Sequence, residues 1–157
     1  MINFKIAAMD SKYIFTSLLR ISDLDQSSFE VDPLDKVKWK TGDYVVGKII
    51  SEGGDFMKIE LINGRMIGFM KEDLVIGALG ESYATLEATG SSREVEEDRV
   101  MHLLPGGGVF GKCTSKSAYL HNLIEIQYQG HVTKKDKVCK MDDSIKNVKT
   151  SKLDLPV

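Results

Sequence analysis

From Lys36 onward the chain is a series of short apolar runs separated by turn residues, a pattern that limits the folds open to it. The runs are rich in Val, Ile and aromatic residues, and they are broken at Thr41-Gly42-Asp43, Gly53-Gly54-Asp55 and Asn63-Gly64. Closely spaced turns with few helical patterns are typical of small all-β domains. The pattern predicts a mainly β fold, either a small β-barrel or an orthogonal β-sandwich, with at most one or two short helices.

The strongest hairpin signal is Asn63-Gly64, which lies between the apolar runs 56–62 and 65–70. Both residue types accept the positive φ angles of a type I′ turn. The sequence therefore predicts two antiparallel strands joined by a two-residue turn.

A weak internal repeat points in the same direction. Residues 42–48 and 72–78 each place an acidic turn residue before a short apolar run and a glycine, and residues 107–112 form a third copy without the acid. A glycine at this place allows the bulges and bends that small barrels need. The alternative is that Gly-Asp turns occur in any β protein and the repeat carries no further meaning.

The length of 157 residues favours a single domain, which we place at residues 1–143. Within it, residues 3–9 are expected to form a strand, and residues 11–21 either a short helix or, at 12–15, a strand. Residues 22–35 hold five acidic and no basic side chains and are expected to form a solvated loop. The lysine-rich residues 144–157 are expected to be a basic linker or the start of a missing C-terminal module.

Composition indicates a cytoplasmic protein that is not bound to a membrane. The net charge is −2, and no apolar run approaches the ~20 residues that span a bilayer. The two cysteines, Cys113 and Cys139, form no C-x-x-C pair and are expected to be reduced.

The stretch from Gly106 to Thr114 nearly matches the phosphate-binding loop G-x-x-x-x-G-K-[ST]. However, Cys113 stands where the motif needs a hydroxyl, and the same Val-apolar-Gly-Lys pattern recurs at Val45–Lys48 in an expected strand. We therefore expect Gly111-Lys112 to lie in a strand, and no nucleotide or other cofactor is predicted.

Candidate ligand-binding residues centre on residues 77–90, a segment rich in glycine, hydroxyl and carboxylate groups. Glycines let a backbone approach a ligand closely. The alternative is a half-exposed strand with a polar outer face. The candidates are Gly80, Glu81, Thr85, Glu87, Thr89, Lys112, Thr114 and Ser115.

No catalytic or metal-binding motif is assembled in the sequence, so no catalytic residue and no metal ligand is assigned. An alternative is a small β-barrel enzyme whose acid–base pair joins Glu81 or Glu87 to His102 or His131, and a zinc site assembled across strands is a further one. A nucleic-acid-binding barrel is also an alternative, but nucleic acid is not the expected partner. Its only stacking candidates, Trp39, Tyr83, Tyr119 and Tyr128, are not interleaved with lysines.

Two stretches, Gly77–Gly90 and Tyr128–Val132 leading to Met141-Asp142-Asp143, resemble an uncharacterised N-terminal β domain. In that group the domain precedes a P-loop ATPase module similar to dethiobiotin synthetases. The resemblance implies that a C-terminal P-loop module, or another partner protein, is the binding partner, and it transfers no functional residue. Together these observations predict a non-catalytic β module that binds or positions a partner domain or a small ligand. They do not indicate an oligomeric state.

Overall fold

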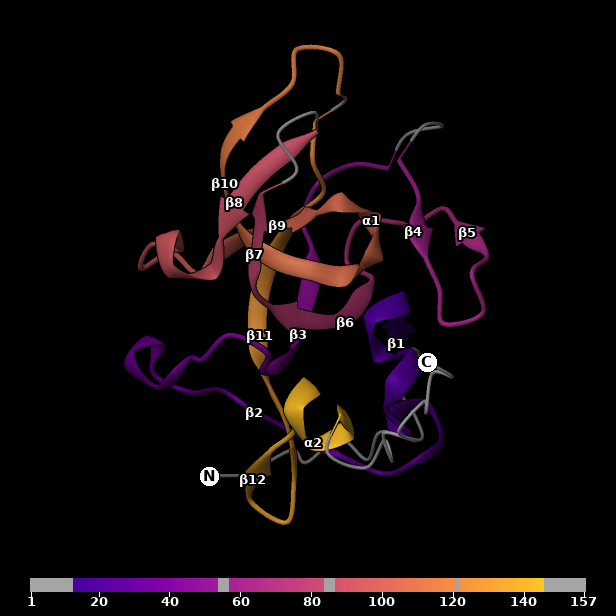
Figure 1. Ribbon diagram of the computed structural model, residues 1–157, viewed down its shortest axis with the longest axis vertical. Coiled ribbons are helices and arrows are strands. Elements are labelled where there is room, and N and C mark those ends of the chain that lie inside the picture. Colours follow the sequence, from indigo (N-terminus) through magenta and orange to yellow (C-terminus); the bar gives the residue numbers. More distant parts are fainter. Residues whose placement is uncertain (1–12, 54–56, 84–86, 121, 146–157) are drawn as a thin grey trace, which may run out of the picture.

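The computed structural model is mainly β, as predicted, and it describes residues 13–53, 57–83, 87–120 and 122–145 (Figure 1). The strands are β1 (Tyr13–Phe15), β2 (Glu30–Asp32), β3 (Tyr44–Ile49), β4 (Ile59–Glu60), β5 (Met66–Ile67), β6 (Leu74–Leu79), β7 (Glu81–Tyr83), β8 (Ala88–Ser91), β9 (Val100–Leu104), β10 (Val109–Lys116), β11 (Glu125–Lys134) and β12 (Lys137–Val138). The helical turns are η1 (Ser17–Ile21), η2 (Leu24–Gln26), η3 (Lys36–Lys38), η4 (Ser92–Glu94), α1 (Pro105–Gly108) and α2 (Met141–Ile145).

The strand pairings of the main sheet return on themselves. Antiparallel pairings run from β6 to β3, β11, β9 and β10, and β10 then pairs in parallel with β6. A ring of this kind leaves no free edge between its members, as in a small β-barrel. β1 adds to β6 outside the ring, and β7 and β8 extend it from β10.

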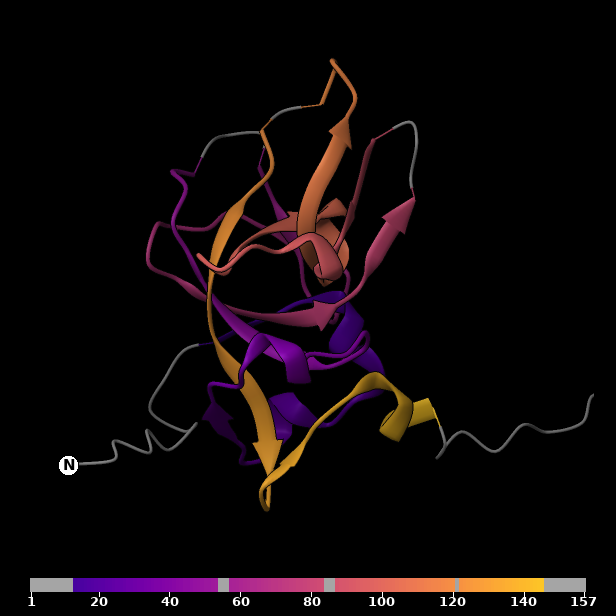
Figure 2. The same cartoon turned by 90° about the vertical axis from the view of Figure 1, so that its left-hand side faces the viewer.

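Two long strands each take part in more than one layer, which Figure 2 shows most clearly. β11 pairs with β9 and β3 in its first part and with β2 and β12 in its last part. β10 leaves β9 and continues along β8. Both strands contain a register shift, between Tyr128 and Gly130 in β11 and between Cys113 and Ser115 in β10. Such bulges bend a strand, which lets it pass from one layer to the next.

The glycines of the repeated pattern lie where the ring is most tightly packed. A Cβ atom on Gly47 would lie 1.9 Å from Ile126 Cγ2, and one on Gly77 would lie 2.3 Å from the carbonyl oxygen of Gly108. Neither distance is compatible with a side chain. The repeat therefore marks close approaches inside the ring. The bulge or bend expected at these glycines is not found, because β3 and β6 pair through both of them without a register shift.

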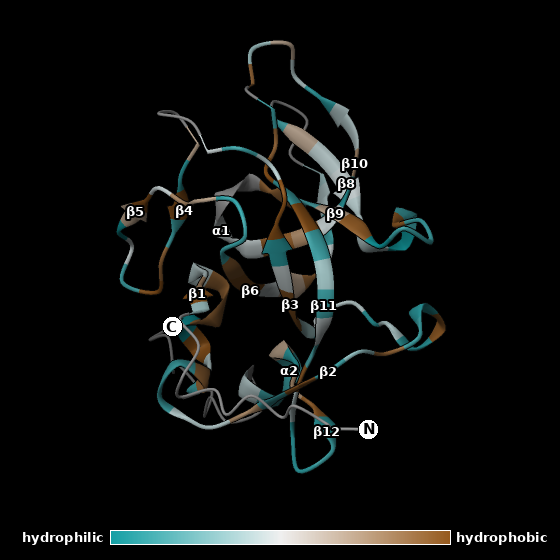
Figure 3. Cartoon of the chain, turned by 180° about the vertical axis from the view of Figure 1, so that it is seen from behind, coloured by the Kyte–Doolittle hydropathy of each residue, from teal (hydrophilic) through white to brown (hydrophobic). Residues whose placement is uncertain are grey.

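The core lies on both sides of β3. Val45 and Ile49 pack in one cluster with Phe110 and Ile126, whereas Tyr44 packs in a second cluster. Because both faces of β3 are buried, its first three residues, Tyr44, Val45 and Val46, are all apolar and do not alternate with polar residues. Figure 3 shows apolar residues mainly on the central strands, although β11 carries many hydrophilic residues, and most of the outer loops are polar.

The hairpin at Asn63-Gly64 is confirmed, but the predicted turn type is wrong. β4 pairs antiparallel with β5, and the Leu61 N–H donates to the Arg65 carbonyl at 2.8 Å. The loop therefore has three residues, and only Gly64 has a positive φ, at 84°. A type I′ turn needs positive φ at two residues, so this is a type I turn followed by a bulge at the glycine.

The expected solvated loop at residues 22–35 is more ordered than the sequence suggested. Leu24 and Phe29 are buried, and β2 within this segment pairs with the end of β11. This order could not be predicted from the sequence, because few apolar residues, Leu24, Phe29 and Val31, anchor a segment that is otherwise rich in acidic side chains. Residues 13–21 contain both alternatives, a strand (β1) followed by helical turn η1. The expected strand at 3–9 and most of the expected linker lie outside the described residues.

Candidate functional site

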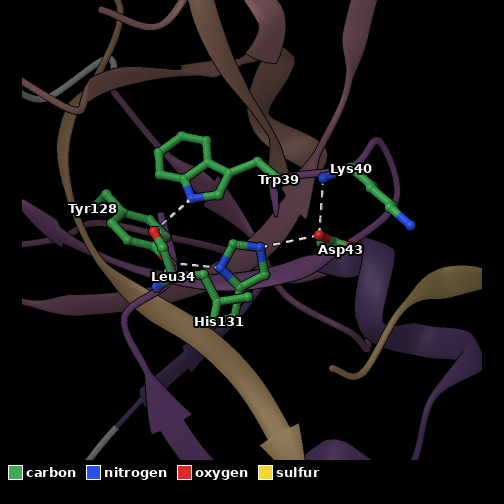
Figure 4. Close-up of polar contacts among 6 residues, drawn as sticks. All are labelled: Leu34, Trp39, Lys40, Asp43, Tyr128 and His131. Atoms are coloured by element: carbon green, nitrogen blue, oxygen red, sulfur yellow. Dashed lines mark hydrogen bonds and ion pairs between the residues drawn. The ribbon is translucent and has the colours of Figure 1, made fainter. Parts of the chain in front are cut away.

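A chain of buried polar side chains runs through one end of the ring (Figure 4). Asp43 Oδ2 lies 3.0 Å from His131 Nε2, and His131 Nδ1 lies 2.5 Å from the Tyr128 hydroxyl. Asp43 precedes β3, whereas His131 and Tyr128 belong to β11. The three side chains are at most 6% exposed.

The bulge in β11 makes this arrangement possible. Tyr128 and His131 are three residues apart, so in a regular strand they would face opposite sides. The register moves from Tyr128 opposite Gly47 to Gly130 opposite Val46, which leaves Gln129 as the extra residue. The extra residue turns the strand by half a period and brings both side chains to the same face.

The hydrogen bonds among these buried side chains run in one direction, from Tyr128 through His131 to Asp43. The Tyr128 oxygen accepts the Leu34 N–H at 3.0 Å, so its own proton is free to be donated to His131 Nδ1. His131 then carries its proton on Nε2 and donates it to Asp43 Oδ2, which also accepts the Lys40 N–H at 3.0 Å. Burial raises the pKa of Tyr128, which keeps the phenol protonated as this direction requires.

This buried chain holds a surface loop in place. The Leu34 carbonyl accepts the Trp39 indole N–H at 3.1 Å, and the Trp39 and Tyr128 rings lie 4.4 Å apart between centroids. The Arg99 guanidinium lies 5.6 Å from the Tyr128 ring centroid. Since His131 is fully buried and both of its ring nitrogens have partners, it cannot reach a substrate. The Asp43–His131–Tyr128 chain therefore positions the loop that carries η3 and Trp39.

Trp39 also lines a pocket of about 470 Å³ between the loop with η3 and the loop with η4. Both loops project on the same side of the ring (Figure 1, left). The lining consists of Lys36, Trp39, Lys40, Thr41, Ser92 and Arg93. Among the described residues, three cationic side chains and two hydroxyl groups thus line this pocket, and no carboxylate does. We call it the basic pocket.

The acidic residues that lie next to the pocket lining in the sequence, Asp35, Asp43 and Glu94, are not part of it, and neither is Glu81. Arg93 Nε lies 3.4 Å from Glu81 Oε1, and Glu81 also bonds to the hydroxyls of Tyr83 and Ser91. These contacts lower the pKa of Glu81, with the Tyr83 hydrogen bond as the largest cause. The carboxylates at 94 and 96–98 belong to exposed residues that follow Arg93. Glu81 therefore restrains Arg93 from outside the pocket.

The candidate residues predicted from sequence fall into separate groups. Glu81 lies beside the basic pocket through Arg93, whereas Thr89 hydrogen-bonds to Thr114 on the outer side of β8 and β10, at 3.2 Å. Gly80 is buried, and its N–H donates to the Phe110 carbonyl. The other members are the half-buried Lys112, the exposed Ser115 and Glu87, and Thr85, which lies outside the described residues. Gly111-Lys112 lies in β10, as predicted.

The acid–base pairs considered from sequence are not assembled. The acid beside His131 is Asp43, and the acid nearest His102 is Glu125, at 3.9 Å. Glu81 is bonded to Arg93, Tyr83 and Ser91 instead. Tyr128, expected outside the core as a stacking residue, is buried because the bulge turns it inward.

A second pocket, of about 630 Å³, lies among the loops at the opposite end and includes His102, Cys113 and Lys116 in its lining. His102 Nδ1 accepts the Cys113 backbone N–H at 3.0 Å, and burial lowers the pKa of this histidine. The Cys113 thiol bonds to the Ser115 carbonyl. The imidazole therefore does not activate the thiol, and no nucleophile is prepared at this place.

Within the described ranges, no group of three or more His, Cys, Asp or Glu side chains gathers as a metal site would require. No helix in the same ranges is long and apolar enough to cross a membrane. Comparison with protein-family models, with curated proteins and with solved structures gives no match to this chain.

Sequence reasoning missed most of the basic pocket. Lys36 and Lys40 lie more than fifty positions before Arg93 in the sequence, so no local motif joins the three residues. The one available signal was the cluster of three lysines around Trp39 in residues 36–40. A tryptophan flanked by cations and followed by a Gly-Asp turn indicates a charged surface loop, but it does not name the second loop that completes the pocket.

Proposed function

We propose that the chain is a non-catalytic β module that binds a small ligand carrying an oxyanion, such as a phosphate or carboxylate group, in the basic pocket. One observation carries the proposal: Lys36, Lys40 and Arg93 line a pocket to which no described residue contributes a carboxylate. Like charges held together repel, and an anion bound among them offsets that repulsion. Thr41 and Ser92 add hydroxyl donors that an oxyanion accepts.

The size and rigidity of the pocket support a small ligand. A volume of about 470 Å³ lies in the range of pockets that hold small molecules. Trp39 and the backbone of Lys40 are fixed by the buried Asp43–His131–Tyr128 chain. A site that is ordered before binding loses less entropy when the ligand arrives.

The resemblance to a domain that precedes a P-loop ATPase module adds a proposed partner to this function. Beside such an ATPase module, the β domain would present the ligand in its basic pocket, or the pocket itself, to the neighbouring module. The proposal for the ligand stands independently of that partner.

Neutralising the cations of the pocket is expected to weaken binding of an oxyanion. A charge-assisted hydrogen bond contributes about 1.5–3 kcal/mol, so Lys40→Gln and Arg93→Gln should each lower the affinity for inorganic pyrophosphate by roughly tenfold or more. Glu81→Gln should raise the affinity, since it frees Arg93 from its ion pair. Isothermal titration calorimetry at constant ionic strength measures all three.

Lys116→Gln is the matched control, because it makes the same change in the second pocket. It should leave pyrophosphate affinity unchanged. Equal losses in Lys40→Gln and Lys116→Gln would mean that binding follows the overall charge, and the basic pocket would no longer be the site.

A further inference from the structure

His102 and Glu125 lie directly opposite each other on β9 and β11, and both side chains line the second pocket, of about 630 Å³. Directly opposite residues of an antiparallel pair have their side chains on the same face. His102 Nε2 nevertheless lies 3.9 Å from Glu125 Oε1, which is too far for a hydrogen bond. The side chains are 17% and 51% exposed, so a ligand in the pocket can reach both of them.

A hydrogen bond at the other ring nitrogen fixes the imidazole of His102. The pairing of β9 with β10 ends where His102 lies opposite Gly111, and the Cys113 N–H beyond this point donates to His102 Nδ1 at 3.0 Å. A backbone N–H can only donate, so Nδ1 holds a lone pair and the ring proton lies on Nε2. Burial lowers the pKa of His102, which keeps the ring neutral in this tautomer. His102 therefore presents an N–H donor to the pocket and not a ligand for a metal ion.

Glu125 presents a hydrogen-bond acceptor beside this donor. The Ser51 hydroxyl accepts the Glu125 backbone N–H at 3.0 Å, which fixes the start of β11 at the pocket. In the described part of the chain, no hydrogen bond reaches the Glu125 carboxylate. Met57 and Leu123 add apolar side chains to the same lining. The pocket thus places one donor and one acceptor side by side, next to apolar surface.

We propose that this pocket is a second binding site, which recognises a primary amide or a ring lactam through His102 and Glu125. The ligand carbonyl accepts the His102 Nε2–H, and the ligand N–H on the same side donates to the Glu125 carboxylate. A trans secondary amide does not fit, because its C=O and N–H groups point in opposite directions. Met57 and Leu123 contact the apolar body of the ligand. This site does not depend on the function proposed for the basic pocket.

NMR titration of the full chain tests the proposal with three probes: nicotinamide as a primary amide, uracil as a ring lactam and N-methylnicotinamide as the matched trans secondary amide. We expect saturable shifts at His102, Cys113 and Glu125 with nicotinamide or uracil. N-methylnicotinamide should bind about tenfold or more weakly than the better of these two. The Cys113 N–H is a specific reporter, because it is bonded to the ring whose other nitrogen meets the ligand. A preference for nicotinamide or for uracil identifies the source of the amide group.

Two variants remove one partner each. Glu125→Ala deletes the acceptor at an exposed position and should weaken binding of the better probe by about tenfold or more. Glu52→Ala is its matched control and should leave the affinity unchanged, since Glu52 lines the same pocket but is paired with Lys71 at 3.7 Å. His102→Asn should also weaken binding, because an asparagine carbonyl can accept the Cys113 N–H but its side chain does not reach the position of Nε2. Its melting temperature shows whether it is folded.

The nitrogen chemical shifts of the His102 ring give an independent check, and they should show the proton on Nε2. The proposal is overturned if the proton lies on Nδ1, if neither nicotinamide nor uracil causes saturable shifts, or if N-methylnicotinamide binds as tightly as the better of the two. Equal losses of affinity in Glu125→Ala and Glu52→Ala would also overturn it, because binding would then follow the charge of the pocket and not the pair.

Discussion

Asp43→Ala is expected to lower the free energy of unfolding by about 3–5 kcal/mol. The substitution leaves the His131 Nε2–H and the Lys40 N–H without their shared acceptor. His131 is fully buried, so water cannot replace the carboxylate without a rearrangement of the core. Urea unfolding followed by circular dichroism measures the change.

Two controls separate the loss of the hydrogen bonds from the loss of the side chain itself. Asp43→Asn keeps an oxygen that can accept both protons and should retain most of the stability. Asp25→Ala removes an exposed carboxylate from the acidic segment and should change stability by less than about 0.5 kcal/mol. If Asp43→Ala is as mild as Asp25→Ala, the buried chain does not hold the loop in place.

Gly108→Ala is expected to destabilise the protein by about 3 kcal/mol or more. Gly108 has a φ of 116°, and a Cβ atom there would lie 2.1 Å from Thr16 Oγ1 and 2.6 Å from Thr16 Cβ. Thr16 cannot move away easily, because it is buried and its hydroxyl donates to the Ile76 carbonyl at 2.7 Å. Backbone strain and overpacking therefore add together.

Gly64→Ala isolates the backbone contribution to this effect. Gly64 also has a positive φ, at 84°, but a Cβ atom there would meet nothing within 4 Å. Its loss should be only about 1–2 kcal/mol, the cost of a left-handed conformation. Equal losses at the two glycines would contradict the close packing of α1 against Thr16.

The sequence predicted features that depend on local chemistry. The apolar runs around Val45 and Val75 became ring strands because consecutive β-branched residues suit strands that are buried on both faces. The repeated glycine proved meaningful at Gly47 and Gly77, where neighbouring strands leave no room for a side chain. Lys112 lies in a strand because it belongs to the same repeat.

Features that depend on strand register could not be read from the sequence. Tyr128 and His131 meet only because Gln129 is an extra residue in β11, and a bulge has no strong local signal. Asp43 was identified as a turn residue, but its bond to His131 joins positions 88 residues apart. The residues that line the basic pocket opposite Trp39 could not be predicted either, because Ser92 and Arg93 belong to a loop that is distant in the sequence.

Intrinsic fluorescence tests the central proposal most directly, because Trp39 is the only tryptophan of the chain and lines the basic pocket. Inorganic pyrophosphate is added to the full chain at constant ionic strength while the tryptophan emission is recorded. We predict a saturable change in emission that is lost when Lys40→Gln and Arg93→Gln are combined. Emission that stays constant across the titration, or a change that persists unaltered in the double variant, would contradict the assignment of the basic pocket as an oxyanion site.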